Sequence, residues 1–198
     1  MKKSIAFFDF DGTVTRKDTM LELARFSKGN LSYYIGLCIL SPWLAGMKVG
    51  LINKVKAKEK LLAYFFGGTS LKSFTDLCIS FSEKILPFLV REDAMATIEK
   101  FKKEKTSVVI VSASAENWVA PWCIKNNLPY ISTRLMVSNN EITGKLCGEN
   151  CNGIEKVIRI KKQFILGDYT DIYCYGDTEG DKMMLKLANH PYYRLFKK

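Results

Sequence analysis

The 198-residue sequence has little of several features that mark special protein classes. No segment repeats at a fixed period, no stretch is of low complexity, and there is a single histidine, His190. With 47% hydrophobic and 12% aromatic residues, the composition excludes a disordered chain and is typical of a globular one. A chain of this length buries roughly 70% of its unfolded surface. We therefore expect one self-sufficient domain, or one domain with an insertion.

The cysteines show no pattern of a disulfide framework. They are scattered, and a chain of this size does not need such bridges, so a reduced, cytoplasmic protein is expected. Cys147 and Cys151 lack the two further ligands that a zinc site requires. The apolar run after the basic N-terminus is broken by Asp9 and Asp11 before a signal-peptide core is complete, which disfavours secretion. The six cysteines are Cys38, Cys78, Cys123, Cys147, Cys151 and Cys174.

Acidic residues are missing from residues 23–58, and this gap concentrates the positive charge of the chain. A basic domain could bind nucleic acid through its phosphates, but no recognition motif accompanies the charge, and we expect no nucleic-acid partner. An anionic substrate or a membrane surface explains the charge at least as well. The gap contributes +6 of the net +10, from Arg25, Lys28, Lys48, Lys54, Lys56 and Lys58.

Short apolar strands alternate with amphipathic helices over most of the chain. Strands separated by helices imply right-handed crossovers, so we predict an α/β fold with a Rossmann-like parallel sheet sandwiched by helices. Ligands of such sheets bind at the carboxyl ends of the strands. The expected strands are 4–10, 107–111, 130–132, 172–175 and 192–196, the helices are 91–105, 115–125, 153–165 and 179–188, and residues 135–146 form a hairpin turning at Asn139 and Asn140.

Residues 17–90 interrupt this alternation, because they show helical periodicity and no convincing strand. We predict a core domain of residues 1–16 and 91–198 and an inserted α-helical cap of residues 17–90. Residues 29–47 are uncharged and close to the ~20 residues of a membrane helix. A single span would separate the acidic motifs at Asp9 and Asp177, so two cap helices broken near Ser41 and Pro42 are expected. A surface-lying or re-entrant apolar patch is the alternative.

The first motif with chemical meaning is Asp9-Phe10-Asp11-Gly12-Thr13, directly after the first strand. Alternate side chains at a strand end point to different sides of the backbone, so Asp9 and Asp11 can hold different roles. Gly12 allows a tight turn over a bound anion. An ordinary turn explains Asp11-Gly12 but not a second carboxylate at the end of so apolar a strand, since a buried acid needs a metal or a base.

Three further motifs follow strands or begin helices. Asp177 and Asp181 could complete a site for a hard cation such as Mg²⁺ with the first motif, although alone they read as a helix cap. Ser112 follows the second strand, where a hydroxyl suits a phosphate oxygen; a helix N-cap is the simpler interpretation of this residue alone. Lys156 lies near a helix start, where the helix dipole does not favour a cation, and this indicates an anion nearby.

Taken together and in this order, the four motifs resemble those of the haloacid dehalogenase-like (HAD) hydrolase superfamily, subfamily IB, which includes phosphoserine phosphatase-like enzymes. The similarity covers nearly the whole chain. It implies a HAD core with a C1-type helical cap. The matching residues are Asp9 to Thr13 for the DxDGT motif, Ser112 for the hydroxyl, Lys156 for the lysine, and Gly176 to Asp181 for the GDxxxD motif.

The resemblance also implies a mechanism. Asp9 would attack phosphorus and form an aspartyl-phosphate, while Asp11 would protonate the leaving oxygen and then activate water. Mg²⁺ would be held by the side chains of Asp9 and Asp177 and the carbonyl of Asp11, with Asp181 in support. The transferring phosphoryl group would be bound by Ser112, Lys156, Gly12 and Thr13. With His190 the only histidine, a carboxylate base is the economical choice.

The reaction type follows from Asp11, because dehalogenases of the superfamily lack an acid at that place and ion-pumping ATPases carry threonine. Phosphatase is favoured over phosphomutase, since nothing marks an ability to exclude water. The expected substrate is a small phosphorylated metabolite. A phospholipid head-group phosphatase at a membrane surface, similar to a phosphatidylglycerophosphatase, is the alternative, with weak peripheral contact at the inner face of the membrane.

Overall fold

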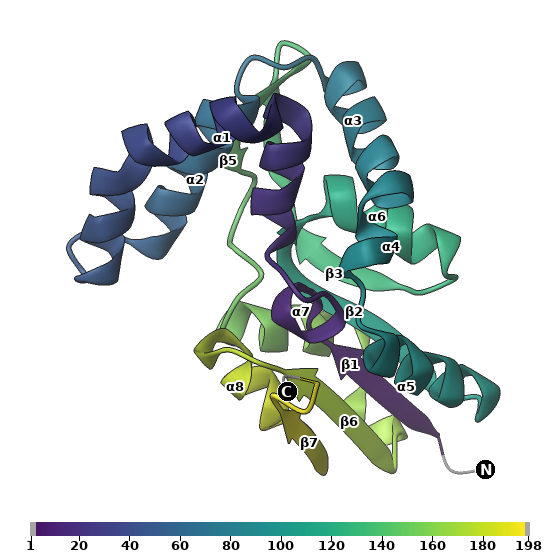
Figure 1. The fold of residues 1–198 in the computed structure, drawn as a ribbon. Helices are drawn as coiled ribbons and strands as arrows, with labels where there is room; N and C mark the ends of the chain where they lie inside the picture. The colour runs from purple at the N-terminus through teal and green to yellow at the C-terminus, as the bar shows by residue number, and fades with distance from the viewer. Residues whose placement is uncertain (1–2, 197–198) are drawn as a thin grey trace.

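The computed structural model describes residues 3–196, which are arranged around a five-stranded parallel sheet (Figure 1). The sheet order is β3-β2-β1-β6-β7, so the first strand of the chain lies at the centre. This confirms the predicted α/β class. The strands are β1 (Ser4–Phe8), β2 (Ser107–Ala115), β3 (Tyr130–Thr133), β6 (Asp171–Gly176) and β7 (His190–Tyr193).

Helices cover both faces of the sheet, and this explains why β1 is apolar at every position but its first. Ala6 and Phe8 face one core together with Ile98, while Ile5 and Phe7 face a second core together with Ile160. A strand buried on both faces needs a continuous apolar run. The flanking helices are α5 (Glu92–Lys103), α6 (Glu116–Lys125), α7 (Ile154–Gln163) and the short α8 (Lys182–Leu185), with a 3-10 turn η2 (Leu166–Asp168).

Several predicted boundaries were wrong. The strand predicted over 4–10 ends at Phe8, and the chain turns through a π-helical segment, η1 (Phe10–Val14), closed by hydrogen bonds from Thr15 to the Phe10 carbonyl. The helix predicted over 179–188 is a 3-10 turn, η3 (Glu179–Asp181), followed by α8. The last strand is β7 rather than 192–196; as an edge strand it accommodates Pro191, which cannot donate to a neighbour.

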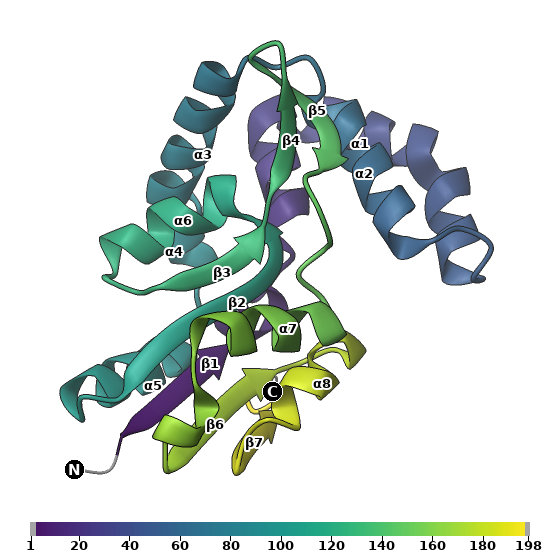
Figure 2. The same ribbon diagram turned by 180° about the vertical axis from the view of Figure 1, so that it is seen from behind.

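Residues 17–90 form a helical lobe that leaves the core and returns to it at one place. Thr15 and Val90 pair in an antiparallel bridge, and the Arg16 amide donates to the Leu89 carbonyl. The lobe also leans on the core, because its third helix packs against α6, as both views show (Figures 1 and 2). Its helices are α1 (Thr19–Lys48), α2 (Lys54–Phe66), α3 (Leu71–Lys84) and α4 (Leu86–Leu89).

The break predicted near Ser41 and Pro42 was also wrong, because α1 continues through both residues. Pro42 cannot donate to the Cys38 carbonyl four residues earlier, but the Ser41 hydroxyl does so at 2.7 Å, so the carbonyl stays satisfied. The irregular residue of α1 is instead Gly29, with φ +74°. Between residues 3 and 196, no helix combines the length and the hydropathy that crossing a membrane requires.

The predicted hairpin is confirmed as β4 (Leu135–Ser138) and β5 (Glu141–Leu146), turning at Asn139 and Asn140. Sequence analysis placed it in the core segment, but in the structure it packs against α2 of the lobe (Figure 2). A Cβ atom on Gly144 would lie 2.3 Å from the backbone of Ala63, so only glycine allows this close packing. The lobe therefore draws on residues beyond 17–90.

Candidate active site

Three buried carboxylates meet at the carboxyl edge of the sheet. Asp9 follows β1 and Asp177 follows the neighbouring strand β6, and the Asp9 amide donates to the Tyr175 carbonyl at 2.9 Å. Asp181 reaches the same point from η3. One oxygen atom of each carboxylate lies within 4.8 Å of the others, and all three residues are buried. The structure thus brings together the two acidic motifs that sequence analysis paired.

Lys156, in the first turn of α7, is the cation of this cluster. Its ammonium group donates to Asp9 Oδ1 at 2.5 Å, to Asp181 Oδ1 at 2.6 Å and to the Val111 carbonyl at 2.9 Å. The residue is only 1% exposed. An ammonium group has three N–H donors, so all three are satisfied, and Lys156 holds the carboxylate of Asp9 in one orientation.

Burial and charge act in opposite directions on the pKa values of the cluster. Burial raises the pKa of Asp9 to about 8, although Lys156 opposes this shift. Burial alone would lower the pKa of Lys156, but Asp9 and Asp181 hold it above its usual range. Desolvation by itself would raise the pKa of Asp181, but Lys156 and the hydrogen bonds from Thr178 lower it below its usual value. An additional cation beside Asp9 would favour its ionised form.

The donor set fits a hard divalent cation. Asp9 and Asp177 offer only carboxylate oxygen atoms, which suit Mg²⁺, and a dense group of buried acids with one lysine is short of positive charge. Asp181 is already engaged: Oδ1 accepts from Lys156 and Oδ2 accepts from the Asp177 amide and from the amide and hydroxyl of Thr178. These bonds favour a supporting role for Asp181. A metal contact from the Asp11 carbonyl stays a prediction.

Gly12 is required by the close approach of Asp177. Gly12 has φ +83°, and a Cβ atom there would lie 2.4 Å from Asp177 Oδ2. The next residue, Thr13, donates its hydroxyl to Asp177 Oδ1 at 3.2 Å. The turn after β1 therefore positions the carboxylate that follows β6, and no larger residue at position 12 leaves room for it.

The Asp11 carboxylate is held apart from the three clustered acids by two donors from other elements. Its Oδ1 accepts from the Thr19 amide of α1 at 2.6 Å, and its Oδ2 accepts from the Ser114 hydroxyl at 2.5 Å. One donor belongs to the lobe and the other to β2 of the core. Asp11 thus lies where the two parts meet, in a position and an orientation different from those of Asp9.

The prediction that Ser112 follows a strand of residues 107–111 was wrong, because β2 continues to Ala115 and contains Ser112. This position also excludes the N-cap interpretation, since the residue before α6 is Ala115. The buried Ser112 hydroxyl accepts from the Ser114 amide at 3.0 Å. Sequence analysis missed Ser114, whose hydroxyl reaches Asp11. The signal was available, since residues two apart in a strand share a face.

A cavity of about 480 Å³ lies between the core and the lobe, with Asp9, Asp11 and Lys156 in its lining. Opposite these charged groups, the lobe supplies a wall of hydrophobic side chains. A ligand in this cavity would meet the ionic groups of the core on one side, and on the other side hydrocarbon together with the ionisable side chains of Asp18, Lys54 and Lys58. The hydrophobic wall consists of Met20, Leu21, Leu37, Leu44, Met47 and Leu61.

Lys58 of α2 is a second residue that sequence analysis did not place in the site. It was counted with the basic surface, but its ammonium group donates to the Ala113 carbonyl at 2.6 Å and to Asn150 Oδ1 at 2.9 Å. Burial lowers the pKa of Lys58 to about 8. The charges of Asp11 and of Asp18, the exposed N-cap residue of α1, oppose this lowering of the Lys58 pKa. No local sequence signal distinguishes Lys58 from the exposed lysines beside it.

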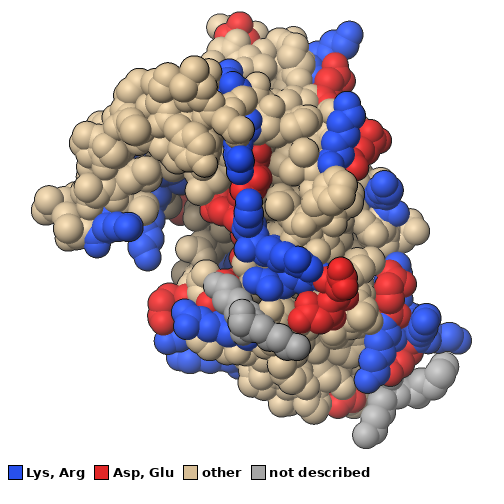
Figure 3. All heavy atoms as spheres, in the orientation of Figure 1, with Lys and Arg blue, Asp and Glu red and all other residues tan. Residues whose placement is uncertain are grey.

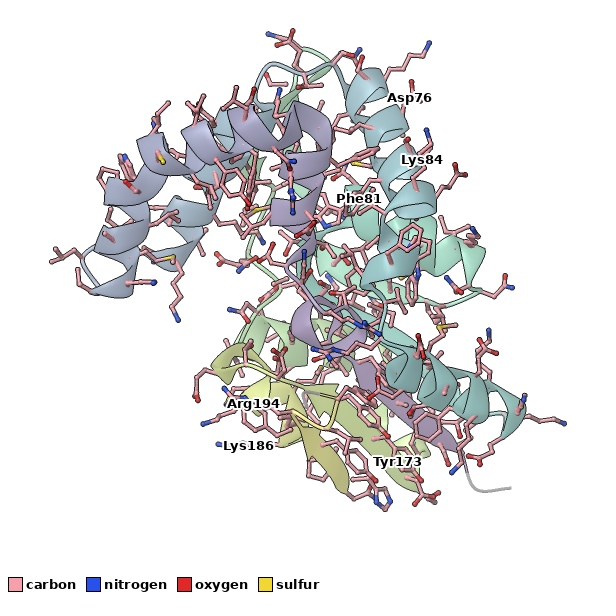
Figure 4. The ribbon with its side chains drawn as sticks, in the orientation of Figure 1. Asp76, Phe81, Lys84, Tyr173, Lys186 and Arg194 are labelled. Carbon is pink, nitrogen blue, oxygen red and sulfur yellow. The ribbon has the colours of Figure 1, made fainter. Side chains whose placement is uncertain are left out.

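The C-terminal segment fastens the loop that carries Asp177. Arg194 donates from Nε to the Asp177 carbonyl at 3.0 Å, and its amide donates to the Gly176 carbonyl (Figure 4). Within the lobe, Phe81 of α3 packs on Phe26 of α1 with ring centroids 6.0 Å apart (Figure 4). Both contacts join segments far apart in sequence, and neither was predicted.

A parallel sheet with paired acidic motifs at its carboxyl edge, a buried lysine between them and a helical lobe over the site defines a hydrolase of the α/β class. The family model of the haloacid dehalogenase-like hydrolases matches residues 6–186. The chain belongs to this family, as the order of the motifs indicated.

The chain is also similar to a known protein in sequence and to solved structures in fold. Protein CicA of Caulobacter vibrioides is 34% identical over 192 residues, which is 96% of this chain and 85% of the relative. A protein with unknown function from Bordetella pertussis Tohama I has the same fold, with a TM-score of 0.81 at 18% identity over 95% of this chain and 88% of that one. Phosphoserine phosphatase in its apo form gives a TM-score of 0.66 at 20% identity, over 94% and 84%.

Proposed function

We propose that the protein is a Mg²⁺-dependent phosphatase that hydrolyses a phosphomonoester through a phosphorylated Asp9. The observation that carries this proposal is the position of Asp9: it is buried, fixed by Lys156, grouped with two further acids and open to a cavity. A carboxylate so placed is a nucleophile beside a site for the charge of a phosphoryl group. The metal, held by Asp9 and Asp177, would neutralise that charge.

In the first step an oxygen of Asp9 attacks phosphorus, and the bond from phosphorus to the leaving oxygen breaks. The only hydrogen bond described for the Asp9 carboxylate goes to Oδ1, which favours Oδ2 as the attacking atom. Lys156 keeps the carboxylate in place and offsets negative charge as the bond forms. Ser112, Gly12 and Thr13 are proposed to help hold the phosphoryl oxygens.

Asp11 is proposed to carry the proton. It gives a proton to the leaving oxygen and later takes one from the water that attacks phosphorus, which releases phosphate and restores Asp9. The Thr19 amide and the Ser114 hydroxyl orient its carboxylate for both steps. Since the carboxylate of Asp11 lies apart from the clustered acids, it can change protonation state while the Asp11 carbonyl is proposed to contact the metal.

The test is Mg²⁺-dependent hydrolysis of para-nitrophenyl phosphate. Wild-type protein should release phosphate, EDTA should stop the reaction, and Asp9→Asn should abolish it. Asp11→Asn should slow turnover on the order of 10²- to 10⁴-fold while leaving Mg²⁺ binding by calorimetry largely intact. Asp76→Asn, an exposed carboxylate on α3 (Figure 4), is the matched control. Wild-type turnover in Asp9→Asn would refute the mechanism.

The substrate is proposed to be a small phosphorylated metabolite. The hydrophobic wall of the cavity favours a second candidate, a phospholipid whose head group ends in a phosphomonoester. Comparing phosphate release from phosphoserine and other soluble phosphomonoesters with release from vesicles that contain phosphatidylglycerol phosphate separates the two. Rapid turnover of a soluble metabolite with none of the vesicle substrate would exclude the lipid.

A further inference from the structure

The outward side of α1 lacks the charged residues that a surface helix normally presents to water. The positions that follow one another along this side, at the spacing of 3.6 residues per turn, are all apolar and all exposed. We call this row the outer stripe. It consists of Leu31, Ile35, Cys38, Pro42, Ala45 and Val49.

The exposure of the outer stripe is large. Leu31 is 76% exposed and Val49 is 69% exposed, and Leu51 just beyond the helix reaches 84%. Tyr34 and Ile39 are exposed beside the stripe. The space-filling view shows this side of the lobe as a nearly continuous surface without charged residues, at the upper left (Figure 3). Hydrocarbon so concentrated on one face marks a contact surface.

The inner side of the same helix is also apolar, but it is covered. Leu40 is buried, while Leu37 and Leu44 line the cavity. Residues 31–47 of α1 therefore carry no charged residue on any side and are largely apolar, although only one side meets protein. A helix of this kind is stable in water only if something less polar than water covers the other side.

Exposed lysines precede and follow the outer stripe in the sequence, and one of them, Lys54, also lines the cavity. Lys28 precedes it, Lys48 lies at its end, and Lys54, Lys56 and Lys60 follow on α2, where Lys60 sits 5.3 Å from the ring centre of Trp43. Within residues 3–196, none of the five forms an ion pair with a carboxylate. No acidic residue occurs from 23 to 58.

We propose that the outer stripe and its lysines form a docking surface for an anionic lipid bilayer, with α1 lying in the plane of the interface. Apolar side chains would enter the boundary between head groups and acyl chains, and the lysines would meet anionic head groups. The charges favour this occupant over a second copy of the chain. A symmetric dimer through the stripe would bring two sets of unpaired lysines together.

The test is cosedimentation with vesicles, in the absence of any phosphorylated substrate. The protein should bind vesicles of equal parts phosphatidylcholine and phosphatidylglycerol at low salt, bind phosphatidylcholine vesicles much more weakly, and dissociate as salt rises. Because binding alone is measured, failure of the proposed phosphatase activity would not affect the result. Binding to neither kind of vesicle would overturn the proposal.

Two triple variants test whether vesicle binding depends on the outer stripe in particular or on any exposed apolar residues. Leu31→Ser with Ile35→Ser and Val49→Ser should reduce binding on the order of tenfold or more. Phe88→Ser with Ile124→Ser and Ile165→Ser removes three other exposed apolar residues and should leave binding unchanged. Equal effects of the two triple variants would overturn the proposal. Hydrolysis of para-nitrophenyl phosphate should be the same in both.

A second pair tests the charges. Lys48→Gln with Lys54→Gln and Lys56→Gln should lower binding by about 100-fold at low salt, whereas Lys103→Gln with Lys105→Gln and Lys161→Gln, three lysines on the core, should lower it much less. Sedimentation velocity tests the alternative that the outer stripe mediates self-association. A wild-type dimer that the stripe variant converts to monomer would assign the surface to self-association and overturn the bilayer proposal.

Discussion

The two sides of the cavity are built in opposite ways. On the core side, Lys156 joins Asp9 and Asp181 in a buried ion-paired group. On the lobe side, α1 offers hydrocarbon to the cavity and again to the solvent. The core side fixes the positions of reacting groups, because each charge is held by a specific partner. The lobe side holds a ligand by contact area, which tolerates variation in ligand shape.

The two sides of the cavity also differ in the interactions that stabilise them. Removing one partner of a buried ion pair leaves a charge without compensation, whereas trimming an exposed hydrocarbon costs almost nothing. The core side is therefore vulnerable to single substitutions. The lobe side is vulnerable only where its helix faces protein, so the two faces of α1 should respond very differently to the same change.

The largest effect is expected for Lys156→Met. The substitution leaves Asp9 and Asp181 buried without their cation, which should lower the free energy of unfolding by about 3–5 kcal/mol. Chemical denaturation measures it. Lys182→Met breaks the exposed pair with Glu179, which water and salt screen, and should cost far less than Lys156→Met. Similar losses in the two variants would mean that the buried lysine has no special structural role.

The next largest effect distinguishes the two faces of α1. Leu40→Ala opens a cavity on the buried face and should lower the free energy of unfolding by about 2–5 kcal/mol. Leu31→Ala, on the exposed face of the same helix, should change it by less than about 0.5 kcal/mol. Thermal and denaturant unfolding measure both. A large loss in Leu31→Ala would show that the outer stripe is already covered by protein.

Gly12→Ala should disturb the core side without removing any charge. The new methyl group would overlap Asp177 Oδ2, and displacing a catalytic group by about 1 Å can lower turnover on the order of 100-fold. Gly148→Ala is a matched control, since Gly148 has φ +81° but no atom within 4 Å of the added carbon. Both variants should lose about 1–2 kcal/mol of stability from backbone strain, and only Gly12→Ala should lose activity.

The core could be predicted in outline from sequence because its signals are local. A strand buried on both faces shows as an apolar run, and an acid directly after it is visible at once, so Asp9 and Asp177 were found together with Lys156. Strand ends were less predictable. Phe10 continues the apolar run of β1 but lies in a π-helical turn, and periodicity does not separate these alternatives.

The lobe was harder to predict because its contacts join distant segments. The sequence marks Pro42 as a breaker, but the Ser41 hydroxyl satisfies the carbonyl that proline leaves free. Lys58 looks like its exposed neighbours in sequence, and only the packing of α2 over the core turns it toward Ala113. The hairpin joined the lobe for the same reason, since nothing in residues 135–146 specifies α2 as their partner.

The last effect is a change of stability with pH, and it concerns Lys58, the cation that reaches from the lobe to the core side. Burial lowers its pKa from 10.5 to about 8, so between these values the unfolded chain holds a proton that the folded chain has lost. Stability must then rise with pH across this window. The free energy of unfolding of wild type, minus that of Lys58→Met, should increase between pH 8 and 10.5 by up to about 3 kcal/mol.

The comparison needs a control for charge alone, and Lys56→Met, an exposed lysine two residues earlier in α2, supplies it. The difference in unfolding free energy between wild type and Lys58→Met should depend on pH. The corresponding difference between wild type and Lys56→Met should not. A difference that stays flat for Lys58 would mean that Asp11 and Asp18 keep its ammonium group charged despite burial. The lobe would then contribute a permanent positive charge to the cavity, and its wall would select ligands by charge as well as by contact area.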